Sequence, residues 1–112
     1  MNDKKVIAID FDGVLNNYSG WAGEDELGTP RECTELFLKM LSERFKVVVF
    51  TVRDSQRVRN WLKEYNLLYM VDHITNRKPK AIAYIDDRAI NFNGNYVEVL
   101  EKLDDFHTWW EQ

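Results

Sequence analysis

Four short apolar runs alternate with segments of helical periodicity along the 112 residues of the chain. Residues 5–9 and 46–51 are almost uniformly apolar and rich in β-branched side chains, which is typical of strands buried on both faces of a parallel sheet. Residues 70–74 predict a weaker third strand, and residues 81–86 predict a fourth. Strands that alternate with helices favour a parallel sheet joined by right-handed crossovers.

Helices are expected at residues 29–44, 54–65 and 97–110. The first has a clear start signal, because Thr29 is a good N-cap, Pro30 suits the first helical position and Glu32 lies three residues after the cap. The polar stretch 13–28 is too irregular for a long helix. We therefore expect an α/β fold: a three-layer α/β/α sandwich of Rossmann-like type, with helices on both faces of a mostly parallel sheet.

The length fits one domain, residues 1–112, with one hydrophobic core. No apolar run approaches the roughly 20 residues that a membrane-spanning helix needs, and the N-terminus has no signal-peptide pattern, so a cytoplasmic protein is expected. The single cysteine, Cys33, has no partner for an internal disulfide or for a structural zinc site.

The net charge of −4 is unevenly distributed. Residues 51–90 hold 8 Lys and Arg against 5 Asp and Glu, whereas residues 91–112 hold 1 against 5. A local basic region in an acidic chain fits an anionic ligand held at one place better than general coating of nucleic acid.

The first and fourth predicted strands each end in a pair of acids. One residue separates Asp10 from Asp12, so alternation directs both carboxylates to the same side, and Gly13 then allows a sharp turn. Asp86 and Asp87 follow the fourth strand, at the edge where parallel sheets bind ligands. Acids this close repel unless a cation lies among them or one is protonated. A metal ion or acid–base chemistry accounts for such pairs, and acids from two strands would suit Mg²⁺.

Transfer of a phosphoryl group also needs hydroxyl and cationic groups near the metal. Thr51 supplies a hydroxyl at the end of the second strand, and either Lys78 or Lys80 precedes the fourth. An aspartate nucleophile, a metal, a hydroxyl and a lysine together make a site for a covalent aspartyl phosphate.

The order of these residues resembles the four motifs of the haloacid dehalogenase (HAD) superfamily over residues 6–94. Residues 9–15 (IDFDGVL) and 78–89 (KPKAIAYIDDRA) carry the resemblance most specifically, and the second segment is similar to small phage and bacterial HAD-like hydrolases. The resemblance implies a phosphatase without a cap domain, because the segments 13–28 and 66–77 are too short to hold one. Such an open site suits a phosphorylated small molecule, a nucleic-acid end or another bulky phosphate.

The resemblance also implies residue roles. Asp10 would be the nucleophile, and Asp12 the acid that protonates the leaving oxygen and then the base that activates water. Thr51 would hold a phosphoryl oxygen, and Lys78, favoured over Lys80 by the family pattern, would offset phosphate charge. The implied metal ligands are Asp10, Asp12 (through its backbone carbonyl), Asp86 and Asp87. Since the family's dehalogenases do not need the second acid, Asp12 favours phosphate esters.

Several further residues have two readings. Arg53 and Arg88 lie just past strand ends, where each could bind substrate or form a surface salt bridge. Asn16 and Trp21 lie in the stretch that would hang over the site, where they could bind substrate or pack the loop. The pair Trp109 and Trp110 either covers the core or forms a homodimer patch.

Two other function classes stay open. A non-catalytic phosphoacceptor, such as a response-regulator receiver domain, also combines acids, Thr and Lys on a parallel sheet, although the Asp-x-Asp-Gly order speaks against it. A module that binds nucleic-acid ends through the basic middle segment is the other.

Overall fold

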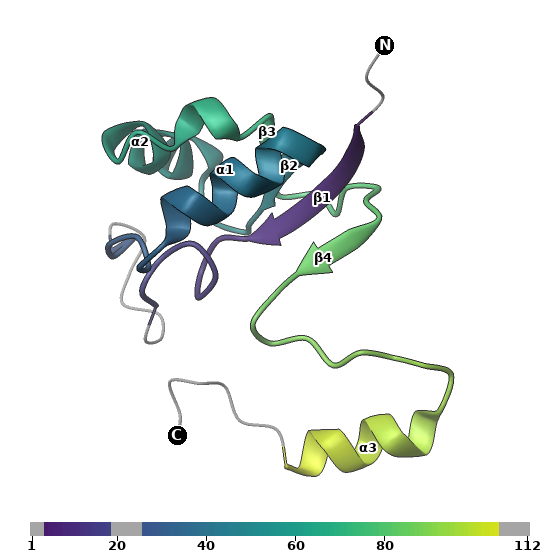
Figure 1. Cartoon of the computed structure of the whole chain (residues 1–112). Helices are drawn as coiled ribbons and strands as arrows, with labels where there is room; N and C mark the ends of the chain where they lie inside the picture. The colour runs from purple at the N-terminus through teal and green to yellow at the C-terminus, as the bar shows by residue number, and fades with distance from the viewer. Residues whose placement is uncertain (1–3, 19–25, 106–112) are drawn as a thin grey trace.

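The computed structural model describes residues 4–18 and 26–105. Four strands form one all-parallel sheet in the order β3-β2-β1-β4 (Figure 1). The strands are β1 (Lys5–Asp10), β2 (Phe45–Phe50), β3 (His73–Thr75) and β4 (Ala83–Ile85). This sheet and its three helices confirm the predicted α/β class and are consistent with a Rossmann-like fold.

The two strands with the most apolar sequences occupy the centre of the sheet. β1 and β2 pair along their whole length, from Lys5 opposite Phe45 to Asp10 opposite Phe50. Ile9 in β1 and Val49 in β2 are completely buried. The shorter strands β3 and β4 lie at the edges, where burial on both faces is not required.

One face of the sheet carries the hydrophobic core. Helices α1 (Thr34–Arg44) and α2 (Ser55–Glu64) cover it, because one cluster of buried side chains joins both helices to alternate residues of the strands. The members that lie on these helices and on β1 to β3 are Ile7, Ile9, Leu38, Val47, Val49, Val58, Trp61, Leu62 and Ile74. Other apolar side chains of α1, among them Leu36 and Met40, are exposed and do not belong to this core.

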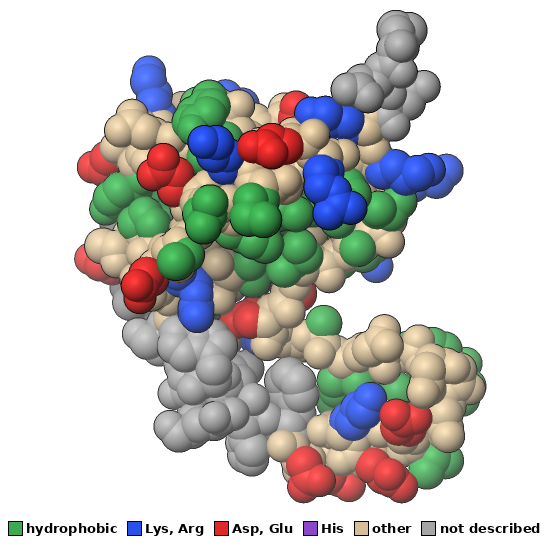
Figure 2. All heavy atoms as spheres, in the orientation of Figure 1, with side chains coloured by type: hydrophobic (Ala, Val, Ile, Leu, Met, Phe, Trp, Pro, Cys, Tyr) green, Lys and Arg blue, Asp and Glu red, His purple; other side chains and the backbone are tan. Residues whose placement is uncertain are grey.

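The opposite face of the sheet differs from the expected three-layer arrangement. Ala8 and Val48, which alternate with the core residues, lie on this face and are absent from the core cluster. The third helix, α3 (Tyr96–Asp104), has no buried residue and lies apart from the sheet at the end of an extended connection (Figures 1 and 2). The described residues therefore form one helical layer against the sheet.

The first helix begins later than its sequence signals predict. Asn17 donates its backbone N–H to the Thr29 carbonyl, and Arg31 donates to the Leu15 carbonyl. The backbone around Thr29 and Pro30 thus runs beside residues 15–17 and cannot also make helical hydrogen bonds. The helix starts after Cys33, which is exposed and has a left-handed φ of 69°.

The other boundaries move by a few residues. The predicted helix 54–65 is confirmed, with the Asp54 side chain accepting from the backbone N–H of Gln56. The predicted strand 70–74 is split, since Leu68–Met70 forms a 3₁₀ turn (η1) and the strand itself begins at His73. The final helix ends at Asp104; Trp21 and the pair Trp109 and Trp110 lie outside the described residues. No helix in residues 4–18 and 26–105 has the length and apolar content needed to cross a membrane.

Candidate functional site

Three acids meet where β1 and β4 end. Asp10 is the last residue of β1, and Asp86 and Asp87 directly follow β4, which pairs with β1. One carboxylate oxygen from each of the three lies within 4.8 Å of the other two. Two ligands on opposite sides of one Mg²⁺ ion are about 4 Å apart, so the three acids have nearly the spacing of a shared hard cation.

The surroundings of Asp10 disfavour an ionised carboxylate that has no positively charged partner. Its Oδ2 atom is buried and accepts no hydrogen bond from any described residue. Burial, followed by the charges of Asp86, Asp87 and Asp12, raises the pKa of Asp10 to about 7. A bound cation would lower this pKa, because it would supply a partner for the buried oxygen and offset the neighbouring charges. The donor set therefore fits a divalent cation with a preference for oxygen.

Gly13 brings Asp87 close to the end of β1. It has a φ of +84°, and a Cβ atom at this position would overlap the carboxylate of Asp87. The Asp87 carboxylate thus occupies the space that a side chain on residue 13 would fill. Glycine is needed here both for the backbone conformation and for the packing of the acid.

Asp12 lies in a different environment from Asp10. The Nε atom of Arg53 is 2.9 Å from each of its two carboxylate oxygens. The Asn16 side-chain amide donates a second hydrogen bond, of 3.2 Å, to Asp12 Oδ1. The Asp12 carboxylate is thus neutralised by the protein, and it does not belong to the Asp10, Asp86 and Asp87 group.

The Arg53 side chain lies inside the protein. It is 0% exposed and forms an ion pair with Asp12. Its role in binding substrate stays a prediction. Arg53 is not the surface salt bridge that was the other reading, because the pair lies inside the protein.

Thr51 lies directly after β2, whose last residue, Phe50, is paired with Asp10. Thr51 is 4% exposed, and its backbone N–H donates to the Thr75 carbonyl. Its hydroxyl oxygen accepts from the backbone N–H of Arg53 at 3.1 Å, which leaves the hydroxyl hydrogen available for another acceptor. Its role with phosphate stays a prediction.

The two candidate lysines lie in different places. Lys78 lines a hollow of about 710 Å³ together with Asp10 and Asp86, and its amine lies 4.7 Å from the centre of the Tyr84 ring. Lys80 instead lines a separate hollow with Lys4, near the beginning of β1. The geometry therefore favours Lys78 as the amine near the acids.

Arg88 lies beside the acidic group. Its backbone N–H donates to Asp86 Oδ1 at 2.8 Å, and its Nε atom is 4.0 Å from Asp87 Oδ1. Its side chain is 55% exposed. Arg88 is thus exposed beside the acids, and its role in binding substrate stays a prediction.

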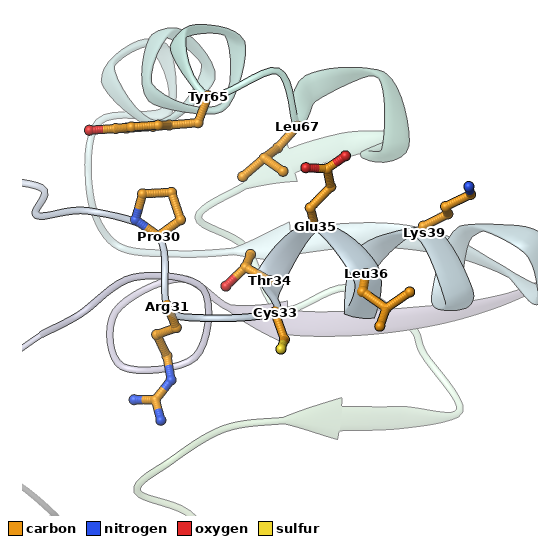
Figure 3. A pocket seen from close by; sticks show the side chains of 9 residues that line it. All are labelled: Pro30, Arg31, Cys33, Thr34, Glu35, Leu36, Lys39, Tyr65 and Leu67. Atoms are coloured by element: carbon orange, nitrogen blue, oxygen red, sulfur yellow. The ribbon is translucent and has the colours of Figure 1, made fainter.

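Another hollow, of about 540 Å³, lies at the start of α1 (Figure 3). Its walls come from residues 30–39 and from Tyr65 and Leu67, which follow α2, and they include none of the predicted site residues. The chemistry-bearing side chains gather instead at the carboxyl ends of the strands.

Comparisons with known proteins support the fold. No family model and no curated protein matches the chain. A solved structure, described as a conserved protein coded by a locus from Bacteroides thetaiotaomicron, is similar with a TM-score of 0.60 and 19% identity. The similarity covers 96% of this chain and 95% of the other. At this identity the similarity shows a shared fold alone.

Sequence reasoning missed the contact of Arg53 and Asn16 with Asp12. The available signal was the position of Arg53, two residues after Thr51. Because β1 and β2 are neighbours, the segments that follow them lie side by side. Their adjacency cannot be obtained from the local pattern of either segment.

Proposed function

We propose that this protein is a Mg²⁺-dependent phosphomonoester hydrolase of HAD type. The observation that carries the proposal is the buried, unbonded Oδ2 of Asp10 beside the carboxylates of Asp86 and Asp87. Bound Mg²⁺ would offset the negative charge on the phosphate oxygens. Asp10, Asp86, Asp87 and the backbone carbonyl of Asp12 would hold it.

In the first step a carboxylate oxygen of Asp10 attacks the phosphorus atom, and the bond from phosphorus to the leaving oxygen breaks. Asp12, in its protonated form, gives its proton to that oxygen. The product is an aspartyl phosphate on Asp10 and a free alcohol. Thr51 would donate a hydrogen bond to a phosphoryl oxygen, and Lys78 would balance its charge.

In the second step a water molecule attacks the phosphorus atom while Asp12 accepts a proton from it. The acyl phosphate bond breaks, inorganic phosphate leaves, and the Asp10 carboxylate is restored. Lys78 and Arg88 are both exposed, which supports a phosphorylated small molecule or a nucleic-acid end as substrate.

The test is release of phosphate from 4-nitrophenyl phosphate, followed by a screen of phosphorylated metabolites, nucleotides and 5′- or 3′-phosphorylated oligonucleotides. We expect activity with Mg²⁺ and none with EDTA. Asp10→Asn should lower turnover by at least about 1,000-fold, because it removes the nucleophile. Asp104→Asn, which changes an exposed acid on α3, is the matched control and should leave activity unchanged.

Other outcomes would replace the proposal. Full activity of Asp10→Asn would remove this residue from the reaction. A phosphorylated protein that persists for minutes without multiple turnover would indicate a phosphoacceptor. Salt-sensitive binding of oligonucleotides without phosphate release would indicate a module that binds nucleic-acid ends.

A further inference from the structure

Both partners of Asp12 also bind the segment formed by residues 26–28. Arg53 donates from Nε to Asp12 and from Nη2 to the Glu26 carbonyl at 3.3 Å. The Asn16 amide donates to Asp12 and, at 2.7 Å, to the Leu27 carbonyl. Two independent side chains thus connect the same carboxylate to the same piece of backbone.

These connections leave the two side chains little freedom. Arg53 is 2% exposed and Asn16 is 1% exposed. The side-chain oxygen of Asn16 also accepts from the backbone N–H of Gly13 at 2.8 Å. Rotating either side chain would leave buried polar groups without partners, at a cost of about 1–3 kcal/mol each.

A third contact holds the segment without involving Asp12. The indole N–H of Trp61, on α2, donates to the Gly28 carbonyl at 2.8 Å. Trp61 therefore holds only the segment 26–28, whereas Arg53 and Asn16 hold both the segment and the acid. A change at Trp61 thus loosens the segment without removing a bond to Asp12.

We propose that Arg53 and Asn16 are positioning residues that couple the orientation of the Asp12 carboxylate to the position of residues 26–28. The inference rests on the proposed function, since Asp12 is the group that would protonate the leaving oxygen. A substrate that displaces residues 26–28 would turn Asp12, and would thereby change proton delivery without contacting the Asp10, Asp86 and Asp87 group. The leaving group of a bound substrate would thus affect the orientation of Asp12 through the position of residues 26–28.

The experiment compares Arg53→Lys, Asn16→Ala, Trp61→Phe and the control Asp104→Asn on two substrates. 4-Nitrophenolate leaves without a proton, whereas the alkoxide of glycerol phosphate needs one. Lysine keeps the charge of Arg53 but cannot span the acid and the Glu26 carbonyl in the same way. For the Arg53 and Asn16 variants we expect kcat on glycerol phosphate to fall by about 10- to 100-fold, with little change in KM. On 4-nitrophenyl phosphate we expect a change below about 3-fold, because general acid catalysis contributes little there.

Trp61→Phe loosens residues 26–28 and keeps the bonds to Asp12, so the coupling predicts a larger loss of kcat on glycerol phosphate than on 4-nitrophenyl phosphate in this variant too. Asp104→Asn should change neither. Equal losses on both substrates in the Arg53 and Asn16 variants would overturn the positioning role, and equal effects on both substrates in Trp61→Phe would overturn the coupling to the segment. Asp10→Asn tests the proposed function separately, because it should abolish turnover of both substrates.

Crystal structures of the same variants test the coupling without turnover. We expect the Asp12 carboxylate to change its orientation in Arg53→Lys and Asn16→Ala. In Trp61→Phe we expect residues 26–28 to shift and the Asp12 carboxylate to turn with them. An unchanged Asp12 in the first two variants, or an unchanged Asp12 in Trp61→Phe, would overturn the inference, even if the protein hydrolyses no phosphate ester.

Discussion

Asp10 and Asp12 lie two residues apart at the end of β1, yet their carboxylates have opposite electrostatic surroundings. Asp10 faces two further acids and has a buried oxygen that no described residue bonds. Asp12 has both oxygens against Arg53 and a hydrogen bond from Asn16. The first carboxylate lies among negative charges, which the proposed Mg²⁺ would offset, whereas the second has a cationic partner in the protein itself. Pairs of acids with such different surroundings are typical of sites that assign them different roles.

The largest test of this difference is the stability of Asp12→Asn. The substitution leaves the Arg53 guanidinium buried without a counter-charge, so we expect it to lower the free energy of unfolding by about 3 kcal/mol. Urea unfolding at pH 8 in EDTA measures this change. A loss below about 0.5 kcal/mol, the size expected at an ordinary surface position, would show that the pair contributes little.

A smaller effect is expected from Gly13→Ala. The left-handed backbone costs a residue with a Cβ about 1–2 kcal/mol, and the overlap with the Asp87 carboxylate adds to this, for a total above about 2 kcal/mol. Gly94→Ala is the matched control, because Gly94 also has a positive φ, of 102°, but no atom lies within 4 Å of its added Cβ. Urea unfolding should separate the two variants. Equal losses of stability would show that the Asp87 carboxylate can move away from the added Cβ without an energetic cost.

The smallest effect is the pH dependence that Asp10 produces without metal. Folding raises its pKa to about 7, so the folded protein keeps a proton that the unfolded chain releases near pH 4. Stability should therefore fall as the pH rises from about 4 to 7, and change little above that range.

Asp10→Asn should remove this slope and raise stability at pH 8 by about 1–2 kcal/mol, less than the full shift implies because the carboxylate is partly exposed. Mg²⁺ should stabilise the wild type at pH 8, by up to about 2.7 kcal/mol at 100 times its Kd, and should stabilise this variant less. Thermal unfolding with EDTA and with Mg²⁺ at pH 5 and pH 8 measures both effects. The same pH dependence in both proteins would contradict the assignment to Asp10.

Much of the fold follows from local patterns. The uniform apolar runs predict the two central strands, and the helical spacing of Val58, Trp61 and Leu62 predicts α2, because in both cases one side of the element must be buried. The predicted start of α1 was wrong, because the backbone of residues 29–31 forms hydrogen bonds with residues 15–17 in spite of its good capping sequence. The predicted helical layer on the other face of the sheet was also wrong for the described residues, because α3 lies apart from the sheet.

The acids of the candidate site were predicted for a general reason. The carboxyl ends of parallel strands meet at one edge, so acids that follow strands are expected there whatever the strand order. The partners of those acids were not predictable in this way. The sequence left Arg53 between a substrate contact and a surface salt bridge, and only the structure shows that it forms a buried ion pair with Asp12.

The sequence by itself determined which residues form the central strands and which acids follow them, because hydrophobic periodicity and the ends of apolar runs are local properties. Only the tertiary structure decided the neighbours of β1. With β4 on one side, Asp86 and Asp87 meet Asp10; with β2 on the other, Arg53 meets Asp12. Strand order depends on how whole faces pack over long sequence separations. The charged neighbours of each acid are therefore determined by the strand order of the sheet, which no single motif contains.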